Sequence, residues 1–321
     1  MPQPTRLKTA VLTATVAAIA CCGLLTASAG AASVVNGDFE TGNLEGWTAY
    51  TATEDGAWFA YAMEPGQEIS APPSGNWAAM TEEVDPDTPI LYQDVALAPY
   101  ATNTLTMTLY YASSEPIAIP TPNTLSVKTI DPDFENQQYR VDVVKPTASI
   151  ESLDPSDILA PVFATKVGDP EEMGPVVFTT DLTPFAGQTV RLRLANAVHE
   201  GPFNAGVDNV SIASTPINTF TKGKLKKGNG SATLEITVPG PGTLKLLSVG
   251  KKGKPKPIKA TTKNPALPTT VKLPLKATNW GQKALKEKGK LSFKVQVTYT
   301  PTGGTPTSQT LSGKLKLKPK H

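Results

Sequence analysis

Two acidic turn motifs stand at the two ends of one long segment of this chain. Residues 34–47 read VVNGDFETGNLEGW, and residues 205–212 read AGVDNVSI. Each motif places acids beside glycine or asparagine, which favour tight turns, and beside apolar residues that suit a core. Carboxylates and the backbone carbonyls of tight turns are hard oxygen ligands of the kind that Ca²⁺ takes at about 2.3–2.6 Å. The two motifs therefore raise the question of a shared calcium site.

Residues for other chemistry are scarce. The only histidines are His199 and the C-terminal His321, and the only cysteines, Cys21 and Cys22, lie near the N-terminus. A Ser/His/Asp triad or a His or Cys metal cluster cannot be built from this set, and no phosphate-binding Gly-Lys loop occurs. We expect His199 to be a loop residue and the protein not to be an enzyme.

Paired carboxylates are the remaining route to hydrolysis. Residues 131–135, DPDFE, place acids at alternate positions, but Pro132 disfavours a central strand there. Because residues 33–214 contain 26 Asp and Glu, some acid pair lies within catalytic range by chance. A glycan-active hydrolase is therefore kept only as the alternative to a binding protein.

Aromatic side chains are the candidates for binding, since their rings offer large apolar faces. The predicted ligand-binding residues are Trp58, Tyr61, Trp77 and Tyr110. Tyr110 stands opposite an apolar alternation and is expected to be exposed. Trp58 and Tyr61 point to opposite faces of one strand, so at most one of them is expected in the core. The alternative for each ring is packing within the sheets, which we predict for Trp47.

Strands are predicted to carry these residues. Apolar and polar residues alternate over 104–111, 138–143 and 189–194, and turn-forming residues bound the runs. This period of two indicates antiparallel sheets with one apolar face. A segment of about 180 residues can bury a full two-sheet core.

The net charge of +2 conceals a sharp division. Residues 33–214 have 6 Lys and Arg against 26 Asp and Glu, which gives −20, whereas residues 215–321 have 22 Lys against 2 Glu, which gives +20. Such a change indicates a domain boundary, placed at Thr215-Pro216.

The basic segment repeats the alternation over 232–238 and 291–299, and lysines such as Lys272, Lys294 and Lys314 occupy the faces opposite the apolar residues. It predicts a smaller immunoglobulin-like sandwich. Nucleic acid is not the expected partner, because base readout favours arginine and stacking rings. The two readings left open are a solvated lysine face and a surface that binds an anionic cell-wall polymer.

The N-terminal residues, 1–32, predict a secretory signal peptide. Arg6 and Lys8 precede an uncharged apolar run that ends in the small-residue sequences ASA and AGA, residues 27–31. An uncleaved anchor and a lipoprotein signal at Cys21 are the alternatives. No second apolar span follows residue 30, so we expect a secreted protein, extracellular or associated with the cell wall.

The segment 34–214 resembles a known family. Its motifs NGDFETGNLEGW (36–47), LYQDV (91–95), DLTPFAGQ (181–188) and AGVDNVSI (205–212) resemble the galactose-binding-like jelly roll of many carbohydrate-binding modules. In that family the first and last strands lie together and often enclose a structural Ca²⁺ ion. The resemblance implies Glu40 and Asp208 as metal ligands, with solvated turn acids as the alternative.

The lysine-rich segment 215–321 resembles terminal sandwiches of secreted actinobacterial proteins, which implies no mechanism. Together these features predict a secreted, non-catalytic surface or matrix protein. We expect a jelly-roll β-sandwich that binds carbohydrate, followed by the smaller sandwich. The alternatives are the glycan-active hydrolase and a purely structural coat component without a small ligand.

Overall fold

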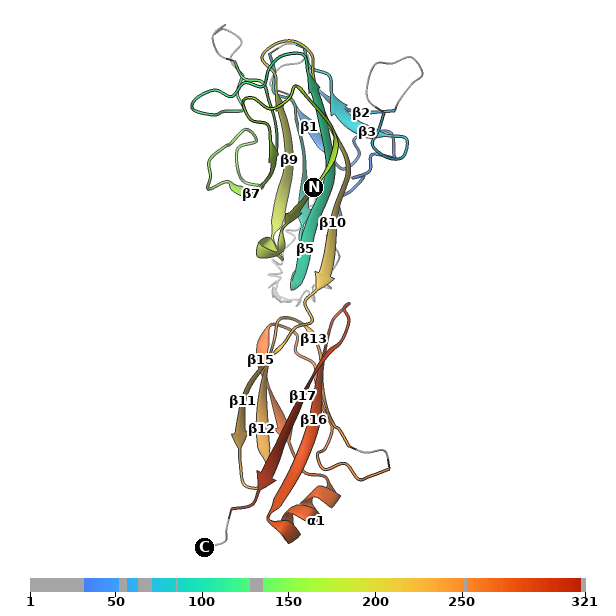
Figure 1. Ribbon diagram of the computed structural model, residues 1–321, viewed down its shortest axis with the longest axis vertical. Coiled ribbons are helices and arrows are strands. Elements are labelled where there is room, and N and C mark those ends of the chain that lie inside the picture. The colour runs from blue at the N-terminus through green and yellow to red at the C-terminus, as the bar shows by residue number, and fades with distance from the viewer. Residues whose placement is uncertain are drawn as a thin grey trace, which may run out of the picture.

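The chain forms two β-sandwiches in tandem. The computed structural model describes residues 32–51, 57–62, 71–84, 86–127, 135–250 and 253–318, and these residues are almost entirely β-structure (Figure 1). The predicted all-β class is confirmed. The predicted signal peptide lies outside the described residues except for Ala32, which is buried in the first core. No helix in the described ranges is long and apolar enough to cross a membrane.

Two five-stranded sheets make up the first sandwich. The first sheet has the order β1 (Thr48–Tyr50), β4 (Ile90–Ala96), β9 (Thr189–Ala197), β6 (Gln138–Val144) and β7 (Ile158–Ala164). The second has the order β2 (Trp58–Tyr61), β3 (Ala78–Thr81), β10 (Phe203–Pro216), β5 (Ala101–Ser113) and β8 (Glu172–Asp181), and the short helix η1 (Thr183–Phe185) follows β8. The neighbouring strands of both sheets run antiparallel, so each sheet has an inner and an outer face.

Alternate side chains from the two sheets fill the core between them. Leu105, Met107 and Leu109 of β5 are fully buried, as are Leu192 and Leu194 of β9. Each such side chain stabilises the fold by about 1.5–3 kcal/mol relative to an exposed position. The alternation predicted for these strands is therefore confirmed.

The opening turn motif is anchored to the same core. Trp47, predicted to be a core residue, is 8% exposed, and its ring stacks on Phe39 with 5.6 Å between the ring centroids. The Trp47 indole N–H donates to the Asn36 carbonyl at 3.1 Å. The motif also joins the last strand of the sandwich, because the Val210 N–H donates to the Gly37 carbonyl at 2.7 Å.

The second sandwich has a three-stranded and a four-stranded sheet. The strands are β11 (Thr221–Lys227), β12 (Ala232–Val238) and β15 (Thr269–Leu275), facing β14 (Thr261–Lys263), β13 (Gly242–Ser248), β16 (Lys290–Pro301) and β17 (Thr307–Lys316). The short strand β14 is the fourth strand of the sheet that contains β13, β16 and β17, and the sheet that contains the first strand, β11, has three strands. In a constant-type immunoglobulin domain the sheet that contains the first strand has four strands and the other sheet has three. The helix α1 (Asn279–Lys288) is capped at its N-terminus by Thr278, whose hydroxyl accepts from the Gly281 N–H at 3.2 Å.

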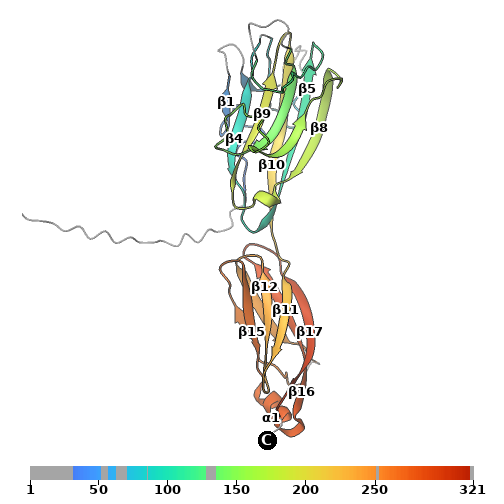
Figure 2. The ribbon, with the colours of Figure 1, turned by 90° about the vertical axis from the view of Figure 1, so that its left-hand side faces the viewer.

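The two sandwiches lie end to end (Figure 2). β10 ends at Pro216 and β11 begins at Thr221, so the passage from one sandwich to the next is short. At this junction the Ile217 N–H donates to the Tyr100 carbonyl at 2.9 Å, and Asn218 Nδ2 donates to the Thr305 carbonyl at 3.2 Å. The helix α1 lies at the far end of the second sandwich, and the turn between β9 and β10 lies at the far end of the first (Figure 1).

Candidate functional site

The two predicted metal ligands, Glu40 and Asp208, lie on either side of the loop that precedes β3. Glu40 Oε1 accepts from the backbone N–H groups of Asn76 at 2.7 Å and Trp77 at 3.0 Å, and Oε2 accepts from Asn76 Nδ2 at 3.3 Å. Asp208 Oδ2 accepts from the N–H and the hydroxyl of Ser74 at 3.1 and 3.3 Å. This loop therefore links the opening motif to the closing strand.

The two carboxylates differ in electrostatic environment. Glu40 is exposed, and the backbone hydrogen bonds from Trp77 and Asn76 lower the pKa of its carboxyl group. Asp208 is fully buried, and burial raises its pKa to about 6 although Asn209 and Ser74 donate hydrogen bonds to it. The negative charge of Glu40 raises the pKa of Asp208 further. The protein donors thus compensate the buried charge of Asp208 only in part.

The donor set of this junction fits a hard cation that takes oxygen ligands. Glu40 Oε2 and Asp208 Oδ1 each accept a single hydrogen bond, the latter from the Asn209 N–H at 2.6 Å, so each has a lone pair left. No cluster of three or more His, Cys, Asp or Glu occurs among the described residues that could hold a metal. A Ca²⁺ ion held by Glu40 and Asp208 would therefore take its remaining ligands from backbone carbonyls and water.

Three of the four predicted ligand-binding rings are buried. Trp58, Tyr61 and Tyr110 are 2%, 5% and 6% exposed. The Trp58 indole N–H donates to the Pro89 carbonyl at 3.1 Å, and the hydroxyls of Tyr61 and Tyr110 hydrogen-bond to each other at 2.8 Å. The predicted exposure of Tyr110 is wrong. Of Trp58 and Tyr61, only Trp58 belongs to the main core, as expected, but Tyr61 is buried as well, in a separate cluster.

The physical reason is a second apolar cluster on the outer face of the sheet. Tyr61, Ala78, Met80 and Tyr110 pack together there, apart from the main core. Gly206 lies opposite Tyr110 on the neighbouring strand, and a Cβ at Gly206 would fall 2.0 Å from the Tyr110 ring. Because Gly206 has no side chain, the Tyr110 ring can pack against β10 at this position. Burial in this cluster raises the pKa of the Tyr110 hydroxyl.

Trp77, the fourth predicted ring, is half-buried. Its indole packs against the main core and also against Gly42, where a Cβ would lie 3.1 Å from the ring. Gly42 has a φ of +70°, so the turn of the opening motif and the indole fit closely. A role of Trp77 in ligand binding stays a prediction, and its packing is already a structural role.

Sequence reasoning missed a charged surface on the outer face of the first sheet. Arg140, Arg191 and Arg193, the only arginines of residues 33–214, all lie on this face. The strand register places Asp94 opposite Arg191 on β4 and Asp142 opposite Arg193 on β6. A module with a net charge of −20 therefore gathers all its arginines on one side of one sheet.

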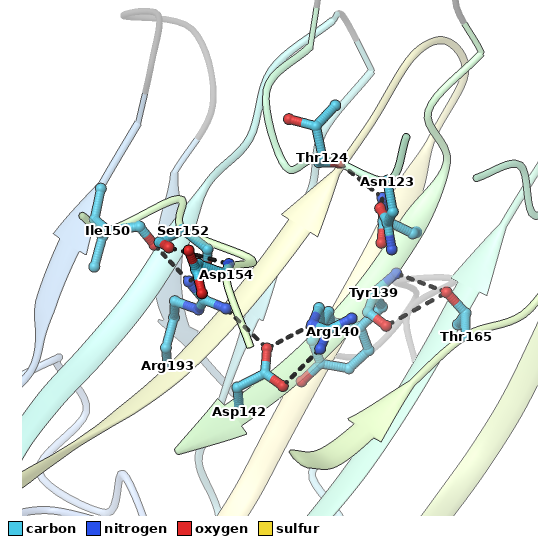
Figure 3. Close-up of polar contacts among 11 residues, drawn as sticks. Asn123, Thr124, Tyr139, Arg140, Asp142, Ile150, Ser152, Asp154, Thr165 and Arg193 are labelled. Carbon is cyan, nitrogen blue, oxygen red and sulfur yellow. Dashed lines mark hydrogen bonds and ion pairs between the residues drawn. The ribbon is translucent and has the colours of Figure 1, made fainter. Parts of the chain in front are cut away.

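The inner part of this surface is a buried ionic network (Figure 3). Asp142 accepts two bonds from Arg140, at 2.6 and 3.0 Å, and one from Arg193 Nη2 at 2.8 Å. Arg193 Nη1 also donates to the carbonyls of Ile150 and Ser152, at 2.9 and 2.7 Å. Burial lowers the pKa of Arg193, and the charge of Asp142 opposes this effect.

The outer part of the surface is partly exposed to solvent. Arg191 makes two bonds to Asp94, at 2.7 and 2.9 Å, and its guanidinium lies 4.4 Å from the centre of the Tyr92 ring. The hydrogen bonds to Asp94 raise the pKa of Arg191. Tyr92 is half-buried, the Asp94 side chain is 39% exposed and the Arg191 side chain is 15% exposed. The surface formed by Tyr92, Asp94 and Arg191 thus presents a ring, a carboxylate and a guanidinium in fixed orientation.

The sequence did contain a signal for this surface. Arg191 and Arg193 fall on the polar positions of the strand alternation over 189–194. Arginine in a strongly acidic segment is unusual enough to favour a specific pairing, because its planar guanidinium matches a carboxylate bidentately. The pattern alone could not identify which aspartates would face these residues across the sheet.

Comparison with known proteins identifies no family for this chain. No protein-family model matches the chain, and no curated protein matches it. The solved structures that resemble it have low TM-scores and low sequence identities, so the similarity is remote. The immunoglobulin-like type of the second sandwich stays a prediction.

Three of these structures show how remote the likeness is. TmCBM61, solved in complex with β-1,4-galactotriose, is 11% identical over 57% of this chain and 99% of its own, with a TM-score of 0.36. The K3 adhesin domain of Lys-gingipain from Porphyromonas gingivalis is 17% identical over 57% and 98%, with a TM-score of 0.36. The adhesin domain of Epf from Streptococcus pyogenes is 11% identical over 86% and 93%, with a TM-score of 0.40.

Proposed function

We propose that this chain is a secreted, non-catalytic surface or matrix protein whose first sandwich binds carbohydrate on the outer face of the first sheet. The surface formed by Tyr92, Asp94 and Arg191 is the observation that supports this proposal. Its three side chains are held together by two hydrogen bonds and a ring contact. Little conformational entropy is left to lose when a ligand binds, which favours affinity.

The chemistry of the surface suits a ligand rich in hydroxyl groups. A carboxylate accepts hydrogen bonds from hydroxyls, and a guanidinium donates to their oxygens, with charge assistance in both cases. The Tyr92 ring adds apolar area beside these groups. The buried network of Arg140, Asp142 and Arg193 fixes the strands beneath, so that the open surface keeps its geometry.

A glycan array tests this proposal with the chain from residue 32 onward, which retains the buried Ala32. We expect Arg191→Ala and Tyr92→Ala to weaken binding of a captured glycan about tenfold or more, because a hydrogen bond to a charged group contributes about 1.5–3 kcal/mol. Thr179→Ala, on the exposed side of β8 in the other sheet, is the matched control. Equal binding by all four proteins, or no binding to any glycan, would refute the assignment of this surface.

A structural Ca²⁺ ion between the opening motif and β10 belongs to the same proposal. The partly compensated charge of buried Asp208 and the spare lone pair on Glu40 support it. Ca²⁺ at about 100 times its dissociation constant should stabilise the chain by about 2.7 kcal/mol. We expect Glu40→Ala and Asp208→Ala to abolish the rise in melting temperature that Ca²⁺ causes after EDTA treatment. Identical melting of the unsubstituted chain with and without Ca²⁺ would contradict the calcium site.

The second sandwich is proposed to bind an anionic cell-wall polymer. Lysines of β11 and β17 lie on exposed strand positions, and among the described lysines only Lys226 makes an ion pair, with Glu235 at 2.7 Å. The charge is therefore free to attract a polyanion, and many weak contacts add up over its length. Retention on anionic wall material should fall steeply between about 50 and 500 mM NaCl, since the screening length shortens over that range. Retention independent of salt would refute the electrostatic mechanism.

A further inference from the structure

The molecule is a rod whose charge is divided along its length. The two sandwiches lie end to end, with −20 on residues 33–214 and +20 on residues 215–321 (Figures 1 and 2). The junction hydrogen bonds at Ile217 and Asn218 involve no charged group. Each ion pair found among the described residues joins two residues of the same sandwich, and none joins the two sandwiches. The opposite charges are thus not paired across the junction of the described chain.

A cavity of about 640 Å³ lies at the acidic end of the rod, away from the second sandwich. The loop after β5, the residues just before β6 and the turn between β9 and β10 line most of it, and these segments lie at the far end of the first sandwich (Figure 1). Ile117 and Ile119 contribute apolar walls, together with neighbouring prolines. Glu115, Glu135 and Glu200 contribute three carboxylates. Such a cavity suits an apolar group that is flanked by positive charges.

The basic end of the rod presents a group of this kind. Trp280, in the first turn of α1, is 48% exposed although tryptophan usually buries a large area. Lys256 and Lys259 line the same shallow hollow as Trp280. Lys283 stands three residues further along α1 and is also exposed. The helix lies at the end of the second sandwich farthest from the first sandwich (Figure 1).

We propose that Trp280 of one chain docks into the cavity lined by Glu115, Glu135 and Glu200 of a second copy of this chain. The indole packs against the apolar walls, and the lysines around it face the glutamates at the rim. An aromatic anchor in a pocket with a charged rim is a common arrangement of interface hot spots. The two surfaces are different, so the contact is heterologous.

The position of the two surfaces determines the form of the assembly. They lie at opposite ends of a rod, so one chain cannot satisfy both by itself. A heterologous contact between the opposite ends of an elongated molecule leaves a free end after each addition, which gives an open, linear assembly. The contact is small and highly charged, so the assembly is weak and depends on salt, with a screening length of about 10 Å at 0.1 M.

Sedimentation velocity of residues 32–321 tests the proposal. We expect the average mass to rise with protein concentration at about 20 mM NaCl and to return to that of the monomer at about 500 mM NaCl. Trp280→Ala, and separately Glu115→Gln with Glu200→Gln, should weaken self-association at least about tenfold. The controls are Leu267→Ala, at another exposed apolar residue, and Glu45→Gln, in a turn outside the cavity; both should associate normally. A monomer at every concentration in low salt would overturn the proposal.

Mixing the two variants separates this contact from any other mode of association. The Trp280→Ala chain keeps an intact cavity, and the Glu115→Gln, Glu200→Gln chain keeps an intact Trp280. Each variant alone should stay monomeric, whereas the mixture should form a 1:1 heterodimer and no longer species. Self-association that survives in both variants, or a mixture that contains only monomers, would refute the head-to-tail contact.

Discussion

Two aspartates on one face of the first sheet bind arginines at different levels of burial. Asp142 and Arg193 are both fully buried, whereas the Asp94 side chain is 39% exposed beside Arg191. Asp142 accepts two bonds from Arg140 and one from Arg193, whereas Asp94 accepts two bonds from Arg191 alone. The substitutions Asp142→Ala and Asp94→Ala therefore remove carboxylate–guanidinium bonds at two levels of solvent access.

The structure gives the expected magnitude for each change. Asp142→Ala leaves the Arg193 guanidinium buried, with only the carbonyls of Ile150 and Ser152 as acceptors, and breaks both bonds of Arg140. Removing one partner of a buried ion pair costs about 3–5 kcal/mol of folding free energy. Asp94→Ala breaks an exposed pair, which is worth about 0–1 kcal/mol. The two substitutions should differ by at least about 2 kcal/mol in the free energy of unfolding.

Urea unfolding followed by tryptophan fluorescence measures this difference. Three of the four tryptophans lie in the first sandwich, so the signal reports mainly on that part of the chain. Both variants should keep the m-value and shift only the midpoint. The double variant Asp142→Ala, Arg193→Met should recover part of the loss, because it also removes the unpaired charge. Equal losses for Asp142→Ala and Asp94→Ala would refute the role that burial plays in this reasoning.

Two further predictions concern the second sheet. The pKa of Asp208 is raised to about 6 in the folded chain, so its contribution to stability is fully present below the unfolded pKa of about 4 and is lost as the pH rises through 6. Without Ca²⁺, the melting temperature relative to Asp208→Ala should therefore fall from pH 4 to pH 7, and a flat difference would contradict the buried charge. Gly206→Ala should destabilise the chain by about 1–3 kcal/mol in urea unfolding, because the new Cβ meets the Tyr110 ring. Tyr110→Leu in the same chain should recover part of that loss, and an unaffected Gly206→Ala chain would exclude the close contact.

The strands and their inner faces could be predicted from the sequence because alternation reports directly on a core. Leu105, Met107 and Leu109 alternate with threonines, and all three are fully buried. The second sandwich follows the same rule, with Leu234 and Ile236 buried on β12. In each case the apolar face is continuous over several residues, so burial in one core explains the whole pattern.

Alternation fails where the outer face of a sheet is also covered. Tyr110 stands on the outer face of β5 as predicted, but the pattern cannot show that Tyr61 and Met80 pack on the same face. Burial there depends on Gly206, a residue far away in the sequence that leaves room for the ring. The buried Arg193 escaped prediction for a similar reason, since Asp142 and the carbonyls that accept from it come from other segments. Both errors concern contacts between segments that are distant in the sequence, and the alternation within one strand contains no information about such contacts.

The two sandwiches differ in which basic side chain they use, arginine or lysine. The three arginines of residues 33–214 gather on one sheet face, and all are bound to aspartates in fixed geometry. Residues 215–321 contain 22 lysines and no arginine. A guanidinium gives oriented hydrogen bonds, whereas an ammonium group on a flexible stem stays hydrated and acts as a point charge.

Salt should therefore distinguish the proposed interactions of this chain. Binding at the Tyr92 and Arg191 surface depends on oriented hydrogen bonds to a ligand, so for a neutral glycan its affinity should change little with ionic strength. Binding of a wall polymer and the head-to-tail contact depend on the field of many lysines, which a shorter screening length weakens. If about 500 mM NaCl abolishes binding of the chain to a glycan as it does binding to the polymer, the glycan binds to the lysines and not to the sheet face.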